Sequence, residues 1–286
     1  MLLSTQTHSL ADTFGREKAV EILAANGYDC YDLSMFEMTS PDAELCGDGG
    51  EAIIASLRKK ADACGIKCNQ THAPFASMRL GDDAYNTHMN KAIKLAIKYT
   101  GMLGGGIVIV HPITVPGDPE EQKRINMEFY NDLIPTLRQW KVKAALENMF
   151  GWADGHATPA ACSTPEQFCE YLDALPKDCF TACLDIGHSG LIGIPAATMI
   201  RALGHDRLGA LHVHDNDMHT DMHTLPFTVR LDWKEITAAL AEINYKGEFT
   251  FEADTFLNRF PGDFRPAASK FMEQTGRLLI SMIENA

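Results

Sequence analysis

Short apolar runs alternate along the chain with longer segments in which apolar residues recur every three or four positions. The short runs are typical of buried strands, and the longer spacing is typical of amphipathic helices. The predicted strands are residues 1–7, 28–34, 66–72, 106–111, 143–147, 181–185, 209–214 and 249–253. Eight strand–helix units without a linker or a break in composition predict one α/β domain over residues 1–286, folded as a single (β/α)8 TIM barrel.

An open, doubly wound parallel sheet is the alternative architecture for such an alternation. The turn after the first predicted strand, THSLADTFG, lacks the GxGxxG pattern that would bind a dinucleotide at that point. The barrel is therefore the favoured interpretation.

Several predicted helices carry their own boundary signals. Asp118 and Thr164 each precede a proline and stand three residues before Glu121 and Gln167, and Asp232 stands three residues before a glutamate. These patterns are typical of helix N-termini, because the side chain at the cap accepts a hydrogen bond from a free backbone N–H. Glycine commonly ends a helix, so helix ends are predicted at Gly27, Gly65 and Gly101.

Composition limits the partners and the location. Hydrophobic residues make up 45% of the 286 positions, and the formal net charge of −13 disfavours a polyanion such as DNA. The eight cysteines contain no CxxC pair, the N-terminus turns polar after three residues, and no apolar run approaches the roughly 18 residues that span a bilayer. We therefore expect a cytoplasmic protein with reduced thiols that binds neither nucleic acid nor membrane.

Ionisable side chains stand at the ends of the predicted strands, where the active site of a barrel lies. These residues are His72, His111, Glu147, Asp185, His188, His212, Asp221, His223 and Glu252. Any one of them could simply cap a helix or satisfy a loop. So many carboxylates and imidazoles at one rim would repel one another or stay unsatisfied without a cation. The set therefore predicts a metal site.

The strings ALENMFG, CLDIGHSGL, LHVHDND followed by DMHTLPF and LDW, and FTFEAD carry a family resemblance. With them the chain resembles the xylose isomerase-like TIM barrels over essentially its whole length. That group contains sugar and sugar-phosphate isomerases and epimerases of the tagatose 3-epimerase type, inosose isomerases and dehydratases, dehydroshikimate dehydratase and endonuclease IV.

The resemblance implies that one divalent cation is held by Glu147, Asp185, His212 and Glu252. Three carboxylates and an imidazole suit Mn²⁺ best, with Mg²⁺, Co²⁺ or Zn²⁺ as alternatives. Glu147 and Glu252 are the expected acid–base pair, and His188 matches a position that contacts substrate oxygens in the epimerases. Two departures leave the substrate open. Met218 stands where tagatose-type epimerases carry an arginine, and PFTV at 226–229 stands where PGxG is common.

Further pocket residues are expected around this quartet. His72, His111, Asp221, His223 and Trp152 are candidate substrate contacts, and the segments 36–50, 148–163 and 214–230 are expected to wall the pocket. His214 either points into the mouth beside His212 or already belongs to the turn, to which Asp215 and Asn216 are suited. The glycine-rich segment 47–51 is more often a plain turn than a phosphate cradle.

The leading functional hypothesis is a metal-dependent isomerase or epimerase of a small sugar, sugar phosphate or polyol carbonyl compound, acting through an enediolate that the metal stabilises. A dehydratase could use the same residues. A trinuclear zinc nuclease like endonuclease IV is the alternative from another class, because all nine of its ligand positions are matched, but the loops after predicted strands two and three are acidic. A non-catalytic binding barrel would be favoured only by a degraded metal site. The oligomeric state, including a homo-oligomer, is left open.

Overall fold

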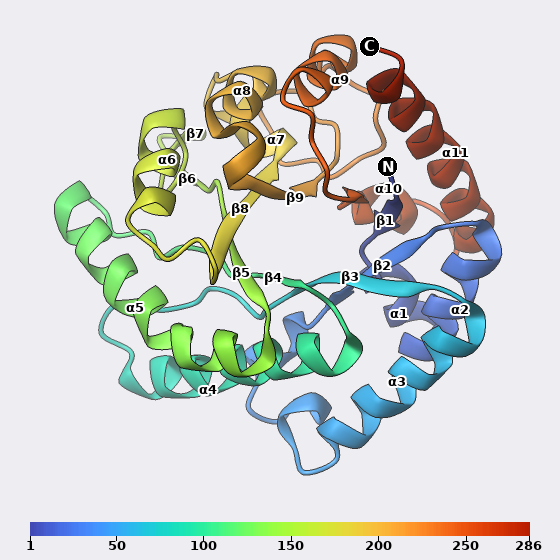
Figure 1. Cartoon of the computed structure of the whole chain (residues 1–286), viewed down its shortest axis with the longest axis horizontal. Coiled ribbons are helices and arrows are strands. Elements are labelled where there is room, and N and C mark those ends of the chain that lie inside the picture. The colour runs from blue at the N-terminus through green and yellow to red at the C-terminus, as the bar shows by residue number, and fades with distance from the viewer.

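The computed structural model describes residues 1–286 and contains eight parallel strands that run through its centre (Figure 1). The strands are β1 (Leu3–Thr5), β2 (Cys30–Ser34), β3 (Lys67–His72), β4 (Ile107–Ile109), β5 (Lys143–Glu147), β8 (Phe180–Asp185), β9 (Leu208–His212) and β10 (Phe249–Phe251). Each overlaps one of the eight predicted runs. Most are shorter than predicted, because pairing stops where the chain turns away at the strand ends.

The parallel strands pair side by side in one curled sheet. Strands β2, β3, β4, β5, β8 and β9 are hydrogen-bonded in that order, and β1 pairs with β10. Single parallel bridges, Gln6 with Asp32 and Val213 with Phe251, connect β1 to β2 and β9 to β10. The predicted fold class is thus confirmed as a parallel α/β sheet with helices outside it (Figure 1).

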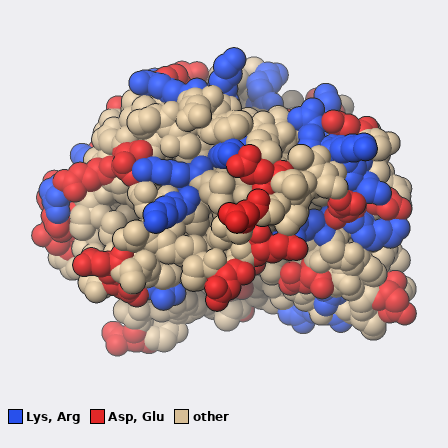
Figure 2. All heavy atoms as spheres, turned by 90° about the horizontal axis from the view of Figure 1, so that it is seen from below, with Lys and Arg blue, Asp and Glu red and all other residues tan.

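Helices surround the sheet and cover its outer face (Figure 1). They are α1 (His8–Phe14), α2 (Arg16–Asn26), α3 (Gly50–Cys64), α4 (Asp83–Leu103), α5 (Pro119–Trp140), α6 (Pro165–Asp173), α7 (Ile186–Leu191), α8 (Ala196–Arg207), α9 (Trp233–Glu242), α10 (Asp254–Asn258) and α11 (Arg265–Glu284). Short 3₁₀ turns are η1 (Phe36–Thr39), η2 (Glu44–Cys46) and η3 (Gly262–Phe264). None of these helices combines the length and apolar character that crossing a membrane requires. On the face in Figure 2, acidic and basic side chains are interspersed.

The predicted helix starts are confirmed at three positions. The side chains of Asp118, Thr164 and Asp232 each accept a hydrogen bond from a backbone N–H in the first turn of α5, α6 and α9. Gly27 and Gly65 end α2 and α3 in the left-handed conformation, with φ of 96° and 72°. These local signals act within one helical turn, so tertiary packing had little opportunity to override them.

The helix end predicted at Gly101 is wrong. Helix α4 continues to Leu103 and ends at Gly104, whose φ is 76°. Gly101 is instead needed for packing, since a Cβ there would lie 2.9 Å from Cε3 of Trp140 at the end of α5. The glycine therefore lets two neighbouring helices approach each other closely.

The segment 148–163, expected to wall the pocket, contains an antiparallel hairpin. Its strands are β6 (Phe150–Ala153) and β7 (His156–Pro159), and Trp152 pairs with Ala157 across it. The turn is made by Asp154 and Gly155, both with positive φ, which matches the Asp-Gly turns favoured in hairpins. That dipeptide was the available signal for the hairpin.

The packing at Gly101 gives a stability prediction. Replacing Gly101 by Ala should lower the free energy of unfolding by roughly 1–3 kcal/mol, because the added methyl group is forced against Trp140. Gly106→Ala is the matched control, since a Cβ there meets no atom within 4 Å. Urea denaturation followed by circular dichroism measures both. A Gly101→Ala protein as stable as the wild type would show that the helices separate without cost.

Candidate functional site

A small apolar layer inside the sheet supports a row of polar side chains. Ile109, Ala145, Cys183 and Ala210 pack together there, one from each of β4, β5, β8 and β9. Side chains two residues apart on a strand point to the same face. The residues two positions further along these strands are His111, Glu147, Asp185 and His212. The alternation of the strands therefore brings these four groups to one mouth, directly above the apolar layer.

The predicted quartet comes together as one cluster. One ligand atom from each of Glu147, Asp185, His212 and Glu252 lies within 4.8 Å of every other, and all four residues are buried. His212 Nδ1 lies 3.3 Å from Glu147 Oε1 and 3.0 Å from Glu252 Oε2. The amide of Gln6 donates a hydrogen bond to the other oxygen of Glu252. Gln6 is not among the site residues expected from the sequence.

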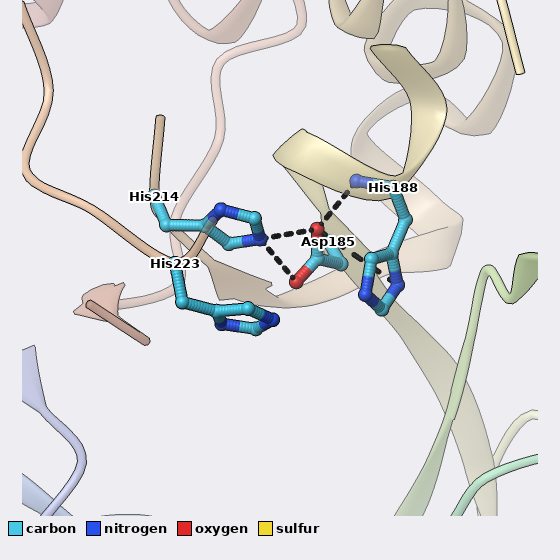
Figure 3. Close-up of side chains that lie close together, drawn as sticks. All are labelled: Asp185, His188, His214 and His223. Carbon is cyan, nitrogen blue, oxygen red and sulfur yellow. Dashed lines mark hydrogen bonds and ion pairs between the residues drawn. The ribbon is translucent and has the colours of Figure 1, made fainter. Parts of the chain in front are cut away.

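A second cluster shares Asp185 with the first (Figure 3). His214 Nε2 lies 3.0 and 3.1 Å from the two carboxylate oxygens of Asp185, and the backbone N–H of His188 donates to Oδ1 of the same group. The His223 ring stacks on that of His214, with centroids 3.9 Å apart. Asp221 Oδ2 lies 3.0 Å from His223 Nε2. The position of His214, left open by the sequence, is therefore inside the mouth and fully buried.

A third cluster lies on the β3–β4 side of the mouth. His111 Nε2 is 3.0 Å from Glu147 Oε2 and 3.1 Å from His72 Nε2. One donor atom each of His72, Glu147 and His212 lies within 4.8 Å of the others, so these three form a further candidate metal-binding group. All nine ionisable residues expected at the mouth are thus gathered there, at its floor or its wall.

The imidazoles control the ionisation of the carboxylates. Burial would raise the pKa of Glu147, but His212 and His111 outweigh it and hold that pKa well below its usual range. The pKa of Glu252 is lowered in the same way, with burial opposed mainly by His212. Burial would lower the pKa of His188, but Asp185, Asp221 and Glu147 raise it to about 9. For His111, burial prevails over Glu147, and its pKa is lowered.

The donor set fits a divalent cation. Glu147 Oε2 is buried and, although it lies 3.0 Å from His111 Nε2, makes no hydrogen bond, which is costly for a polar atom unless another partner completes the site. Oxygen-rich sets with one imidazole suit hard or borderline divalent ions. The residues of the first cluster could therefore hold such an ion without rearrangement of the strands.

A cavity of about 450 Å³ opens above the clusters. Its floor is polar, with Glu147 and Glu252, and its outer wall carries Phe75, Phe150 and Trp152. The lining includes the expected contacts His72, His111, His188, Asp221, His223 and Trp152, and it contains no lysine or arginine. A ligand entering this cavity would meet carboxylates and imidazoles at the bottom and aromatic rings at the entrance.

The walls differ in part from those expected. Segments 148–163 and 214–230 contribute lining residues, but 36–50 does not. Two residues of 36–50 support the wall from behind. The ring of Phe36 lies 4.9 Å from that of His72 and 5.0 Å from that of Phe75 between centroids, and the Thr39 hydroxyl donates a hydrogen bond to the Phe75 carbonyl. Residues 75–78 and 112–114 line the cavity instead, and no pattern in the sequence predicted them there. Segment 47–51 and Met218 also lie outside the lining.

A buried aspartate anchors one wall. Asp215 accepts hydrogen bonds from the backbone N–H groups of Val229, Arg230 and Leu231 and from the indole of Trp233. Asp215 is fully buried, so it ties the far end of the 214–230 segment to the end of β9. The sequence predicted only a role in the local turn for Asp215. Its hydrogen-bond partners instead lie fourteen to eighteen positions away.

The raised pKa of His188 predicts a pH dependence of stability in protein freed of divalent cations with a chelator. The folded state holds a proton up to about pH 9, whereas unfolded histidine loses it near pH 6.5. The stabilisation is therefore complete below about pH 6.5 and is lost as the pH rises through 9. His188→Asn should flatten this decline, and His156→Asn, at an exposed position, should not. Urea denaturation between pH 6 and 9.5 measures it, and equal slopes for His188→Asn and wild type would refute the assignment.

Comparison with known proteins finds relatives of similar sequence and solved structures of similar fold. D-psicose 3-epimerase of Enterocloster bolteae is 26% identical over 161 residues, which are 56% of this chain and 50% of that enzyme. The matched segments span half or less of the curated relatives found. A D-tagatose 3-epimerase-like protein superposes with a TM-score of 0.76 at 18% identity, covering 99% of this chain and 100% of that one. The IOLI protein with a bound zinc atom gives 0.74 at 16% identity, covering 100% and 99%.

The model of the family described as xylose isomerase-like TIM barrel matches residues 20–270. This range is most of the chain and includes every residue of the three clusters. The family resemblance inferred from the sequence is thereby confirmed. The chain belongs to the xylose isomerase-like TIM barrel family.

Proposed function

We propose that this protein is a divalent-metal-dependent isomerase or epimerase of a small sugar or polyol that carries a carbonyl group. The observation that carries the proposal is the buried cluster of Glu147, Asp185, His212 and Glu252, of which Glu147 and Glu252 line the cavity. The similarity to a D-psicose 3-epimerase and the shared fold of a D-tagatose 3-epimerase-like protein support it. The proposal takes the sheet as a closed (β/α)8 barrel, because closure brings β5 and β10 to a common mouth.

Glu147, Asp185, His212 and Glu252 are the proposed ligands, and Mn²⁺ is the ion that this oxygen-rich set favours. The IOLI protein has a zinc atom, so zinc is the main alternative. A bound divalent ion would polarise the substrate carbonyl and stabilise negative charge when the neighbouring C–H bond is broken.

Glu147 and Glu252 are the proposed acid–base pair. Both line the cavity, and their lowered pKa values keep them ionised at neutral pH. One carboxylate removes the proton α to the carbonyl, and the other, after taking up a proton from solvent, delivers that proton to the opposite face. A dehydratase would need the second carboxylate to protonate a leaving hydroxyl instead.

The remaining wall residues would orient the substrate. His188, His72, His111, Asp221 and His223 can exchange hydrogen bonds with hydroxyl groups, and Trp152 offers an aromatic face at the entrance. Met218, which stands where a family arginine is expected, lies outside the lining. Substrate choice would therefore depend on the histidine-rich wall rather than on a guanidinium group.

The second and third clusters favour one alternative function. Together with the first they supply the donors for three cations, as a trinuclear zinc nuclease would require. Against this alternative, a nucleic-acid site needs cationic side chains for phosphates, and the cavity lining has none. Counting the ions decides between the two functions.

Metal analysis of the purified protein by mass spectrometry should give about one Mn-like ion per chain. His223→Ala, which removes a member of the second cluster only, should retain that ion. Glu147→Ala should lose most of it. Two or three zinc ions per wild-type chain, with loss of one in His223→Ala, would favour the nuclease over the isomerase.

Replacing Glu252 by Gln should slow solvent deuterium exchange at the carbon α to the carbonyl by about 10²-fold or more, because an amide cannot act as a base. Glu147→Gln should slow exchange of the α proton on the opposite face of the substrate. Each variant should therefore still exchange the α proton of one of the two epimers, but not of the other. Free ketohexoses such as D-tagatose and D-psicose are suitable probes, followed by NMR. Glu248→Gln, outside the cavity lining, is the control. Wild-type exchange in both Gln variants would exclude these carboxylates as the acid–base pair.

A further inference from the structure

A buried aspartate lies behind the histidine of the first cluster. Asp32, on β2, is fully buried, and its Oδ2 lies 3.7 Å from Nε2 of His212. His212 Nε2 has no hydrogen-bond partner, and neither does the other carboxylate oxygen, Asp32 Oδ1. A buried carboxylate with one oxygen unpaired thus lies beside an unpaired imidazole nitrogen.

The two nitrogens of His212 face different carboxylates. Nδ1 points toward Glu147 and Glu252, at 3.3 and 3.0 Å, whereas Nε2 points toward Asp32. A neutral imidazole has one N–H donor and one free lone pair, and the partner of one nitrogen determines which is which. The His72 ring, nearly parallel to that of His212 at 5.4 Å, holds the ring plane.

Asp32 is itself held in place. The amide of Gln70 on β3 donates to Asp32 Oδ2 at 2.9 Å, and the Thr250 hydroxyl donates to the Gln70 amide oxygen at 3.3 Å. No lysine or arginine pairs with Asp32, and His212 is the one cationic partner within 4 Å. A buried carboxylate with so few partners costs stability, so packing alone does not account for an acid at this position.

We propose that Asp32 is a positioning residue for the metal centre: it accepts the Nε2–H of His212 and so reserves the Nδ1 lone pair for the divalent cation. The inference rests on the proposed function only in requiring that this cluster binds a metal. Carboxylates that orient a ligand histidine in this way typically contribute 10- to 100-fold to metal affinity. Asp32 lies behind the histidine and touches neither the cavity nor a substrate in it.

The wild-type protein tests the orientation directly. Protein with ¹⁵N-labelled histidine is loaded with ¹¹³Cd²⁺, and the nitrogen that couples to cadmium is identified by NMR. The expected result is coupling through Nδ1 of His212, with a slowly exchanging proton on Nε2. Coupling through Nε2 would overturn the proposal, and this measurement needs no substitution that might unfold the protein.

Substitution then tests the effect on affinity. Asp32→Asn and Asp32→Ala should each weaken Mn²⁺ binding about 10- to 100-fold in calorimetric titrations. Asp29→Asn is the matched control, because Asp29 lies just before β2 and pairs with Arg277 and the Leu3 N–H, away from the cluster. Its Mn²⁺ affinity should stay within about twofold of wild type. Asp32 variants that fold and bind Mn²⁺ as tightly as the control would overturn the positioning role.

A further variant separates this inference from the proposed function. His212→Ala should abolish most Mn²⁺ binding. If His212→Ala bound Mn²⁺ like wild type, the metal centre itself would be wrong, and the role of Asp32 with it. If His212→Ala lost binding while both Asp32 variants kept it, the metal centre would stand and only the positioning role would fail.

Discussion

The burial of Glu147, Asp185 and Glu252 within one small volume is the constraint on which the rest of the mouth depends. Three carboxylates cannot remain ionised together away from water unless positive charge or hydrogen-bond donors surround them. Here imidazoles supply that compensation, since His212 and His111 hold the pKa of Glu147 well below its usual range. Two buried atoms nevertheless make no hydrogen bond, namely Glu147 Oε2 and His212 Nε2. A divalent cation would satisfy the first of these atoms, and Asp32 is placed to satisfy the second.

The regular alternation of side chains along the strands brings these groups together. Small apolar residues on β4, β5, β8 and β9 fill the inside of the sheet, and the polar donors stand two residues further along the same strands. The loops that follow need only wall the cavity. One of them is tied down by Asp215, and another is stiffened as the β6–β7 hairpin that carries Phe150 and Trp152. The outcome is a charged floor under an aromatic entrance, an arrangement suited to a small polyhydroxylated ligand.

The three clusters of possible metal ligands overlap, and this limits how many cations can bind independently. Glu147 belongs to two of the clusters and Asp185 to two, so a second ion would bind only by sharing a ligand with the first. Donor residues alone therefore do not separate a one-metal isomerase from a three-metal nuclease. The cavity wall distinguishes the two functions better, because a lining without lysine or arginine has no cationic group to bind a phosphate backbone.

The sequence by itself determined the parts of this protein that depend on neighbours within a few residues. Strand and helix periodicity, the caps at Asp118, Thr164 and Asp232, and the polar residues that follow each strand can all be recognised locally. Tertiary structure alone decided that α4 passes Gly101, that His214 turns inward onto Asp185, and that Asp32 lies behind His212. The last two contacts join residues 29 and 180 positions apart, and they exist only because the strands pair in one register. No local pattern encodes that register, since it results from how the whole sheet curls around its apolar layer.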